Sequence, residues 1–205
     1  AAMAEYGFII DLEKCVGCHG CSVACKQANG TPPGDTRSKV LRSYEGKYPN
    51  STRMIRPMLC MMCENPKCVA ACPTGASSVN DDGIVVIDKE TCIGCEKCMD
   101  ACPYGARYHI PNEDGYFGSD LNEYEQVTYA SKGMLPDTVD KCDFCVRHSE
   151  DGNPDPVCVR ACMTEARYFG PLDEVKKRVE ERGGEVYLPE EGTSPRVYYL
   201  PVINS

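Results

Sequence analysis

The chain has 205 residues, of which 16 are cysteine and none is tryptophan, and its formal net charge is −9. This acidic balance argues against a nucleic-acid partner, which would require a basic face. The longest apolar run, residues 58–63, is far shorter than the roughly 18 residues that span a bilayer, so no direct membrane span is expected. Residues 1–4 show no signal peptide, so we expect a protein that is soluble, or peripheral through a partner, in the cytoplasm or exported with that partner.

An internal repeat organises the chain. Residues 10–18 read Ile-Asp-Leu-Glu-Lys-Cys-Val-Gly-Cys and return as Ile-Asp-Lys-Glu-Thr-Cys-Ile-Gly-Cys at 87–95. The apolar runs 8–10 and 84–87 predict short strands that enter cysteine loops, and residues 81–83, Asp-Asp-Gly, predict a turn before the second strand. Each unit is therefore predicted to be a strand, a ligand loop and a short helix that carries a last cysteine.

The repeat extends beyond the cysteine loops. In all four quartets the last cysteine follows an alanine, and two quartets continue as Ala-Arg-Tyr, at 106–108 and 166–168. One structural unit has been copied and modified.

Other segments lie outside the repeated units. Residues 26–57 and 110–139 are polar and contain glycine and proline, so we expect two loop-rich insertions. Residues 172–182 predict a short amphipathic helix that stops at a Gly-Gly pair, and residues 195–200 predict an extended tail lying along another element. The apolar face of the predicted helix comprises Leu172, Val175 and Val179.

The sixteen cysteines form four quartets. The first and third have the spacing C-x2-C-x2-C-x3-C, the second C-x2-C-x4-C-x3-C, and the fourth C-x2-C-x12-C-x3-C. The first spacing is the bacterial ferredoxin run for [4Fe–4S] clusters. In sequence order the quartets are Cys15, Cys18, Cys21 and Cys25; Cys60, Cys63, Cys68 and Cys72; Cys92, Cys95, Cys98 and Cys102; and Cys142, Cys145, Cys158 and Cys162.

This spacing has a physical reason. A cubane needs one soft thiolate at each of four iron corners, and a tight loop reaches three of them. The last cysteine points away, and in two-cluster ferredoxins it binds the other cluster, so quartets work in pairs. Structural zinc is the rival, because two C-x2-C pairs are also zinc spacing, whereas a disulfide framework does not require repeated cysteine triplets.

The sequence contains no residues that indicate a reaction other than electron transfer. The sequence has no Ser/His/Asp set, phosphate loop or dinucleotide glycine motif, so no catalytic residue is predicted. Each oxidised cluster with four thiolates carries about two negative charges, which basic residues near the quartets can offset, unless these are only solvated surface charges. The candidates are Lys14, Lys26, Arg56, Lys67, Lys97, Lys141 and Arg160.

The order of the four spacings, with its long fourth gap, resembles the four-cluster iron–sulfur subunit of the molybdopterin oxidoreductase (dimethyl sulfoxide reductase) family, polysulfide reductase type. The resemblance implies that the first and fourth quartets exchange their last cysteines, as do the second and third. The implied ligand sets are Cys15, Cys18, Cys21 and Cys162; Cys25, Cys142, Cys145 and Cys158; Cys72, Cys92, Cys95 and Cys98; and Cys60, Cys63, Cys68 and Cys102. It also implies that the first set lies nearest the catalytic subunit.

The expected fold is α+β, with two pseudo-symmetric bacterial ferredoxin-like 2[4Fe–4S] modules and loop insertions. One module comprises residues 1–25 plus 140–205, and the other comprises residues 58–109. The expected function is an electron-transfer subunit, not an enzyme by itself, that relays electrons through four [4Fe–4S] clusters.

The resemblance implies two kinds of partner. One is a large molybdopterin (Mo or W) catalytic subunit, and the other is a quinol-linked membrane subunit or a soluble electron carrier. Two other functions stay open on the sequence: a free-standing polyferredoxin or hydrogenase-type relay, and a structural zinc protein.

Overall fold

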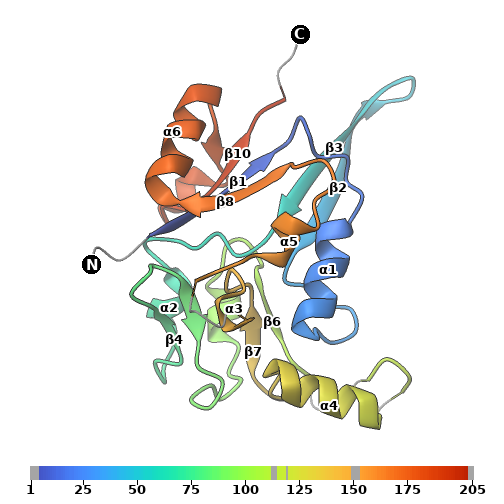
Figure 1. The fold of residues 1–205 in the computed structure, drawn as a ribbon, viewed down its shortest axis with the longest axis vertical. Helices are drawn as coiled ribbons and strands as arrows, with labels where there is room; N and C mark the ends of the chain where they lie inside the picture. The colour runs from blue at the N-terminus through green and yellow to red at the C-terminus, as the bar shows by residue number, and fades with distance from the viewer. Residues whose placement is uncertain (1–4, 112–114, 119, 149–152, 203–205) are drawn as a thin grey trace.

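The computed structural model describes residues 5–111, 115–118, 120–148 and 153–202. Residues 1–4, where no signal peptide is expected, lie outside the described residues, as do positions 112–114 and 119 of the second predicted insertion. The chain forms short helices and small sheets, which is an α+β fold (Figure 1). No helix within these described ranges is long and apolar enough to cross a membrane.

A four-stranded sheet joins the two ends of the chain. Its order is β8 (Arg167–Pro171), β1 (Tyr6–Asp11), β10 (Val197–Leu200) and β9 (Glu185–Val186). The pairing of β1 with β10 is parallel, whereas β8 and β9 pair antiparallel with their neighbours. The predicted N-terminal strand and the predicted extended tail are therefore direct neighbours.

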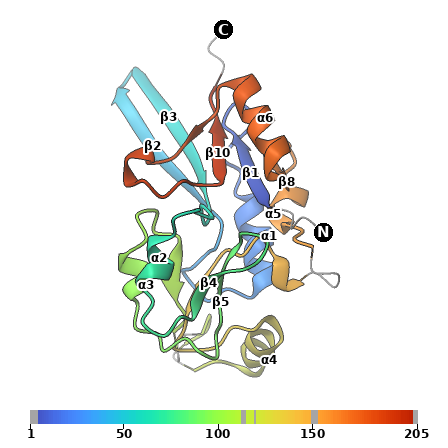
Figure 2. The same ribbon diagram turned by 90° about the vertical axis from the view of Figure 1, so that its left-hand side faces the viewer.

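Three two-stranded antiparallel sheets complete the β-structure. The longest pairs β2 (Lys39–Lys47) with β3 (Asn50–Met58) and projects from the body of the molecule (Figures 1 and 2). The second pairs β4 (Ser77–Val79) with β5 (Val85–Ile87), joined through the predicted turn, in which Gly83 has a φ of 73°. The third pairs β6 (Arg107–His109) with β7 (Val139–Lys141), across a long stretch of sequence.

Helices carry or flank the cysteine segments. Three have four residues each and follow a cysteine loop, namely α2 (Lys67–Ala70), α3 (Lys97–Asp100) and α5 (Val157–Arg160). The longer ones are α1 (Gly20–Asn29), α4 (Glu123–Lys132) and α6 (Leu172–Arg182). Two 3-10 turns, Val146–His148 and Pro189–Glu191, lie in the connections.

The stretches predicted to be loop-rich contain regular structure. Residues 39–58 form the β2–β3 hairpin, and residues 123–132 form α4, whose N-terminus has a complete capping box between Asn122 and Glu125. The hairpin escapes a pattern search because its outer two-thirds is exposed on both faces, so apolar and polar residues do not alternate.

The largest hydrophobic cluster of the described residues draws on both ends and the middle of the chain. It contains Phe8 and Ile10 from β1, Met61 and Ile84 from the middle of the chain, and Val197 from the last strand. Phe8 stacks on Phe144 with ring centroids 5.7 Å apart. The predicted modules thus share one core, because their inner strands bury the same apolar surface.

Helix α6 covers the sheet as the apolar pattern predicts. Val175 is fully buried in a second cluster with Ile9 and Leu200, and the helix ends at Gly183, which adopts the left-handed conformation with a φ of 65°. An added Cβ at Gly7 would lie 2.9 Å from Val175 Cγ1, so the helix approaches the strand closely where no side chain intervenes.

We expect Val175→Ala to lower the free energy of unfolding by about 1.5–3 kcal/mol, because it removes two buried methyl groups from this cluster. Lys176→Ala, on the exposed face of the same helix, should change it by less than about 0.5 kcal/mol. Urea unfolding of both variants measures the difference. Equal effects would mean that α6 is not docked on the sheet through Val175.

Candidate iron–sulfur sites

All sixteen cysteines are described and free of disulfides. They gather in four places, and each place combines three cysteines of one quartet with the last cysteine of another. We call these sets groups 1 to 4. Group 1 is Cys15, Cys18, Cys21 and Cys162; group 2 is Cys25, Cys142, Cys145 and Cys158; group 3 is Cys72, Cys92, Cys95 and Cys98; group 4 is Cys60, Cys63, Cys68 and Cys102.

Groups 1 and 3 each line a small enclosed cavity. The first is walled by the four cysteines of group 1 together with Arg167 and, from the hairpin, Val40 and Pro57. The second is walled by the four cysteines of group 3 together with Ile87 and Val139. In both cavities the distant cysteine, Cys162 or Cys72, meets the loop that carries the other three.

Groups 2 and 4 are packed more deeply. Burial raises the pKa of Cys142 well above its ordinary value, and the nearby sulfurs of Cys25, Cys158 and Cys145 raise it further. In group 4, burial raises the pKa of Cys63 to about 12, and the neighbours that add to this are sulfurs of its own group, Cys60, Cys68 and Cys102. Thiols crowded in this way need a cation if they are to be thiolates.

The two repeated loops share one backbone conformation. Gly17 and His19 have φ values of 68° and 63°, and the corresponding Gly94 and Glu96 have φ values of 64° and 59°. An added Cβ at Gly94 would lie 2.2 Å from the carbonyl oxygen of Asp137, so this glycine allows the loop to approach its neighbour. The left-handed turns direct successive cysteines toward one side of the loop.

Backbone amides point at several of the sulfurs. Ser77 N–H donates to Cys72 Sγ at 3.4 Å, and Ala166 N–H donates to Cys162 Sγ at 3.3 Å. Burial works against ionisation at Cys72, but hydrogen bonds from Ser77 and Thr74 lower its pKa overall to about 7. These donors are suited to a sulfur that carries negative charge.

The arrangement fits a multi-iron cluster better than zinc. Across the described parts of the chain, no three Cys, His, Asp or Glu side chains converge so as to hold a single metal ion. Structural zinc needs four ligands around one ion, whereas a cubane receives its thiolates at separate corners. In addition, the buried Nη1 and Nη2 atoms of Arg167, which lines the cavity of group 1, have no oxygen acceptor. A cluster with negative charge would supply what these nitrogens lack.

A buried ionic network joins the segments around group 2. Arg37 Nε and Nη2 donate to the two carboxylate oxygens of Asp140 at 2.7 and 2.9 Å, and its Nη1 donates to Asn29 Oδ1 at 2.6 Å and to Asp143 Oδ1 at 3.2 Å. Lys89 Nζ reaches Asp140 Oδ1 at 2.8 Å. Burial alone would raise the pKa of Asp140, but Arg37 and Lys89 hold it below its usual value.

Asn29 connects this network to the cysteines. Its amide nitrogen donates to the backbone oxygen of Cys25 at 2.8 Å and lies 3.5 Å from Cys25 Sγ. Sequence reasoning missed these residues, because Arg37 and Asp140 are about a hundred positions apart and neither lies in a motif.

The basic residues named from the sequence mostly have other partners. Lys141 is buried and donates to the backbone oxygens of Val85 and Cys142, and Arg56 stacks on Tyr187 at 4.4 Å. Lys67 and Arg160 form exposed ion pairs with Glu191 and Asp155.

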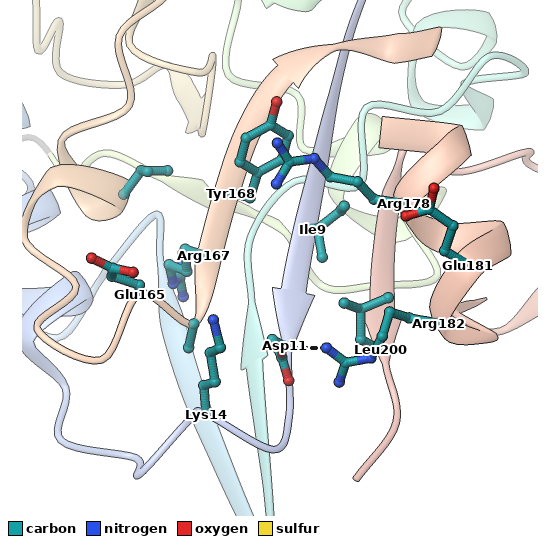
Figure 3. Close-up of a pocket in the computed structure, with 12 residues that line it drawn as sticks. Ile9, Asp11, Lys14, Glu165, Arg167, Tyr168, Arg178, Glu181, Arg182 and Leu200 are labelled. Carbon is teal, nitrogen blue, oxygen red and sulfur yellow. Dashed lines mark ion pairs between the residues drawn. The ribbon is translucent and has the colours of Figure 1, made fainter. Parts of the chain in front are cut away.

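A larger surface cavity of about 400 Å³ lies between β1, β8 and α6 (Figure 3). Within the described residues its walls are charged and aliphatic side chains and Tyr168, without cysteine, and Asp11 pairs with Arg182 at 3.6 Å inside it. Ala166 and Arg167 line both this cavity and the cavity of group 1, so the two are neighbours.

Comparison with known proteins agrees with this geometry. Residues 14–76 and residues 52–116 each match a family described as a 4Fe-4S dicluster domain. The fold and the cysteine groups therefore define a ferredoxin-type iron–sulfur protein, and two dicluster domains with sixteen cysteines support four [4Fe–4S] clusters as its cofactors.

The similarity to known relatives covers almost the whole chain. The chain is 39% identical to a dimethyl sulfoxide reductase iron-sulfur subunit of Halobacterium salinarum, over 97% of this chain and 79% of that protein. It is 40% identical to a selenate reductase subunit of Mesobacillus selenatarsenatis, with coverages of 96% and 72%, and 34% identical to a polysulfide reductase chain of Wolinella succinogenes, with coverages of 96% and 94%. The protein belongs to the family of electron-transfer iron–sulfur subunits of dimethyl sulfoxide reductase-type oxidoreductases, and it is not itself a catalytic subunit.

Arg37→Met should lower the free energy of unfolding by about 3–5 kcal/mol, because it leaves buried carboxylates short of a cation. Asp155→Asn, which breaks an exposed pair, should cost less than about 1 kcal/mol. The urea midpoint of unfolding, followed by absorbance and circular dichroism, measures both. An Arg37→Met midpoint equal to that of Asp155→Asn would contradict a stabilising role for the network.

Proposed function

We propose that this chain relays electrons between a molybdopterin (Mo or W) catalytic subunit and either a quinol-linked membrane subunit or a soluble carrier. The observation that supports this most is the set of four cysteine groups, each assembled from two segments, within one continuous core. The printed names of the relatives, which are components of reductases, supply the kind of partner.

We further propose that groups 1 to 4 are the ligand sets of the four clusters. Groups 1 and 2 would form one ferredoxin-like module, from residues 1–25 plus 140–205, and groups 3 and 4 a second, pseudo-symmetric module at 58–109. When bound, such clusters accept and release one electron at a time. The protein residues hold the thiolates in place, donate N–H groups to them and shield group 2, whose four cysteines are all buried, from water.

Serine substitutions test the exchange of cysteines between quartets. Cys18→Ser and Cys162→Ser should perturb the same cluster signal in electron paramagnetic resonance, whereas Cys25→Ser should perturb a different one. The unsubstituted protein should contain about 16 iron atoms, from four clusters of four. If Cys18→Ser and Cys25→Ser perturbed the same signal instead, the quartets would bind clusters without exchange; about four zinc ions and no iron would support the structural zinc protein.

The β2–β3 hairpin supports group 1 as the end that faces the catalytic subunit. Val40 and Pro57 at its base line the cavity of group 1, while Tyr44 and Tyr48 toward its tip are 72% and 94% exposed. A projecting two-stranded hairpin gains little from its own packing, so a partner surface is a natural support. Its charges are predominantly basic in an otherwise acidic protein: Lys39, Arg42, Lys47, Arg53 and Arg56 against Glu45.

Reversing two of these charges, in Lys47→Glu with Arg53→Glu, should weaken co-purification with the large catalytic partner by about tenfold or more at low salt. The matched control is Lys176→Glu with Lys177→Glu, on the exposed face of α6. Iron content should stay unchanged in both. Unchanged association of the hairpin variant would move the docking surface elsewhere, and a fully functional monomer that needs no large partner would favour a free-standing polyferredoxin or hydrogenase-type relay.

A further inference from the structure

Two buried arginines occupy equivalent positions in the repeat. Arg107 and Arg167 are each the fifth residue after the last cysteine of a quartet, within the two Ala-Arg-Tyr sequences. Each begins a short strand, β6 or β8, and each is only 5% exposed. The corresponding positions of the other two quartets are Ser77 and Gly30.

The guanidinium of Arg107 contacts a cysteine directly. Its Nη2 donates to Cys68 Sγ at 2.9 Å, and its Nη1 donates to Ser77 Oγ at 2.8 Å. Burial would lower the pKa of Arg107, but the sulfurs of Cys68, Cys60 and Cys98 raise it overall. Its neighbours therefore come from group 4 and also from group 3.

The guanidinium of Arg167 lies in the same relation to the other two groups. It lines the cavity walled by group 1 and lies 5.8 Å from the centre of the Phe8 ring. Burial would lower the pKa of Arg167, but the sulfurs of Cys158, Cys21 and Cys162 raise it overall. These cysteines belong to groups 2 and 1.

The strands fix the direction of both arginines. Side chains alternate along a strand, so the tyrosine that follows each arginine lies on the opposite side. Tyr168 lies beside Arg178 of α6, 3.9 Å from the guanidinium carbon to the ring centre (Figure 3), and Tyr108 donates to Asp140. The tyrosines thus have contacts of their own, while Arg107 donates to Cys68 and Arg167 lies between the outer cavity and the cavity of group 1.

Neither arginine has a carboxylate partner. Among the described residues, no ion pair joins Arg107 or Arg167 to an aspartate or glutamate, and the buried terminal nitrogens of Arg167 have no oxygen acceptor, so that the sulfur of Cys158 is the group to which this side chain can donate. Buried arginine is rare unless it is paired, because the charge cannot be removed by deprotonation. The negative charge that balances these two cations must come from the cysteine groups themselves.

We propose that each arginine is a shared counter-cation for a pair of clusters, Arg107 for groups 3 and 4 and Arg167 for groups 1 and 2, and that it raises the reduction potentials of its pair. The inference rests on the proposed ligand assignment. Reduction adds one negative charge to a cluster, so a fixed positive charge nearby stabilises the reduced form. Because the arginine serves both groups, it also lowers the repulsion between two reduced neighbours.

Redox titration of the cluster-loaded protein, followed by electron paramagnetic resonance, tests the proposal. In Arg107→Gln the ratio of reduced to oxidised form at a fixed potential should fall about tenfold for two clusters, a shift of about 59 mV for a one-electron couple, and stay unchanged for the other two. Arg167→Gln should give the complementary pattern. The lysine variants retain the charge and should shift less, while Arg53→Gln on the exposed hairpin should shift none.

Glutamine variants with full iron content and unchanged potentials would overturn the role of the arginines and leave the ligand assignment intact. Absence of iron from the unsubstituted protein would overturn both the ligand assignment and the role of the arginines. If a glutamine variant loses its clusters, unsubstituted protein with ¹⁵N in the arginine guanidinium groups gives the answer. Pulsed resonance of its reduced clusters should show ¹⁵N coupling, and no coupling would overturn the proposal.

Discussion

The rest of the structure depends on one constraint. The last cysteine of each quartet must lie beside three cysteines of another quartet. Cys162 must reach the loop of Cys15, and Cys25 must reach the segment of Cys142, although more than a hundred residues separate them. The antiparallel pairing of β1 with β8 supports this, because Ile10 lies opposite Arg167 and the segment that leads from β1 to Cys15 therefore lies at the same end as the segment that leads from Cys162 into β8. The antiparallel pair of β6 and β7 likewise joins the segment after the third quartet to the segment before the fourth.

Charge compensation is the second requirement of such a molecule. The protein is acidic overall, yet its interior holds fixed cations at Arg37, Arg107 and Arg167. Arg37 is matched by Asp140 and Asp143, which makes it a structural cross-link between segments. Within the described residues the other two have no carboxylate partner and lie beside cysteine sulfur. Buried arginine thus has two roles in this protein. It cross-links segments where its partners are carboxylates, and it balances cluster charge where its neighbours are sulfurs.

The sequence predicts the parts of the fold that depend on local pattern. The cysteine loops, the turn at Gly83, the helix ending at Gly183 and the strand character of residues 8–10 follow from spacing and periodicity, and the structure agrees. The long hairpin was not predictable by alternation because both its faces are exposed, whereas α4 did carry a readable signal in Asn122 and Glu125. The Arg37 network depends on contacts between distant segments, which no local pattern contains. The repeated Ala-Arg-Tyr was visible, but only the burial of its arginines and their contacts with sulfur in place of carboxylates give them a role.

The placement of the groups along the chain has a consequence for biosynthesis. Groups 3 and 4 use only cysteines between Cys60 and Cys102, so all eight are available once the middle of the nascent polypeptide has left the ribosome. Groups 1 and 2 need Cys15 to Cys25 and also Cys142 to Cys162, and β1 waits longer still for β10 to complete the sheet. The eight cysteines of groups 3 and 4 are therefore synthesised together, whereas Cys15, Cys18, Cys21 and Cys25 are synthesised long before the cysteines that complete groups 1 and 2.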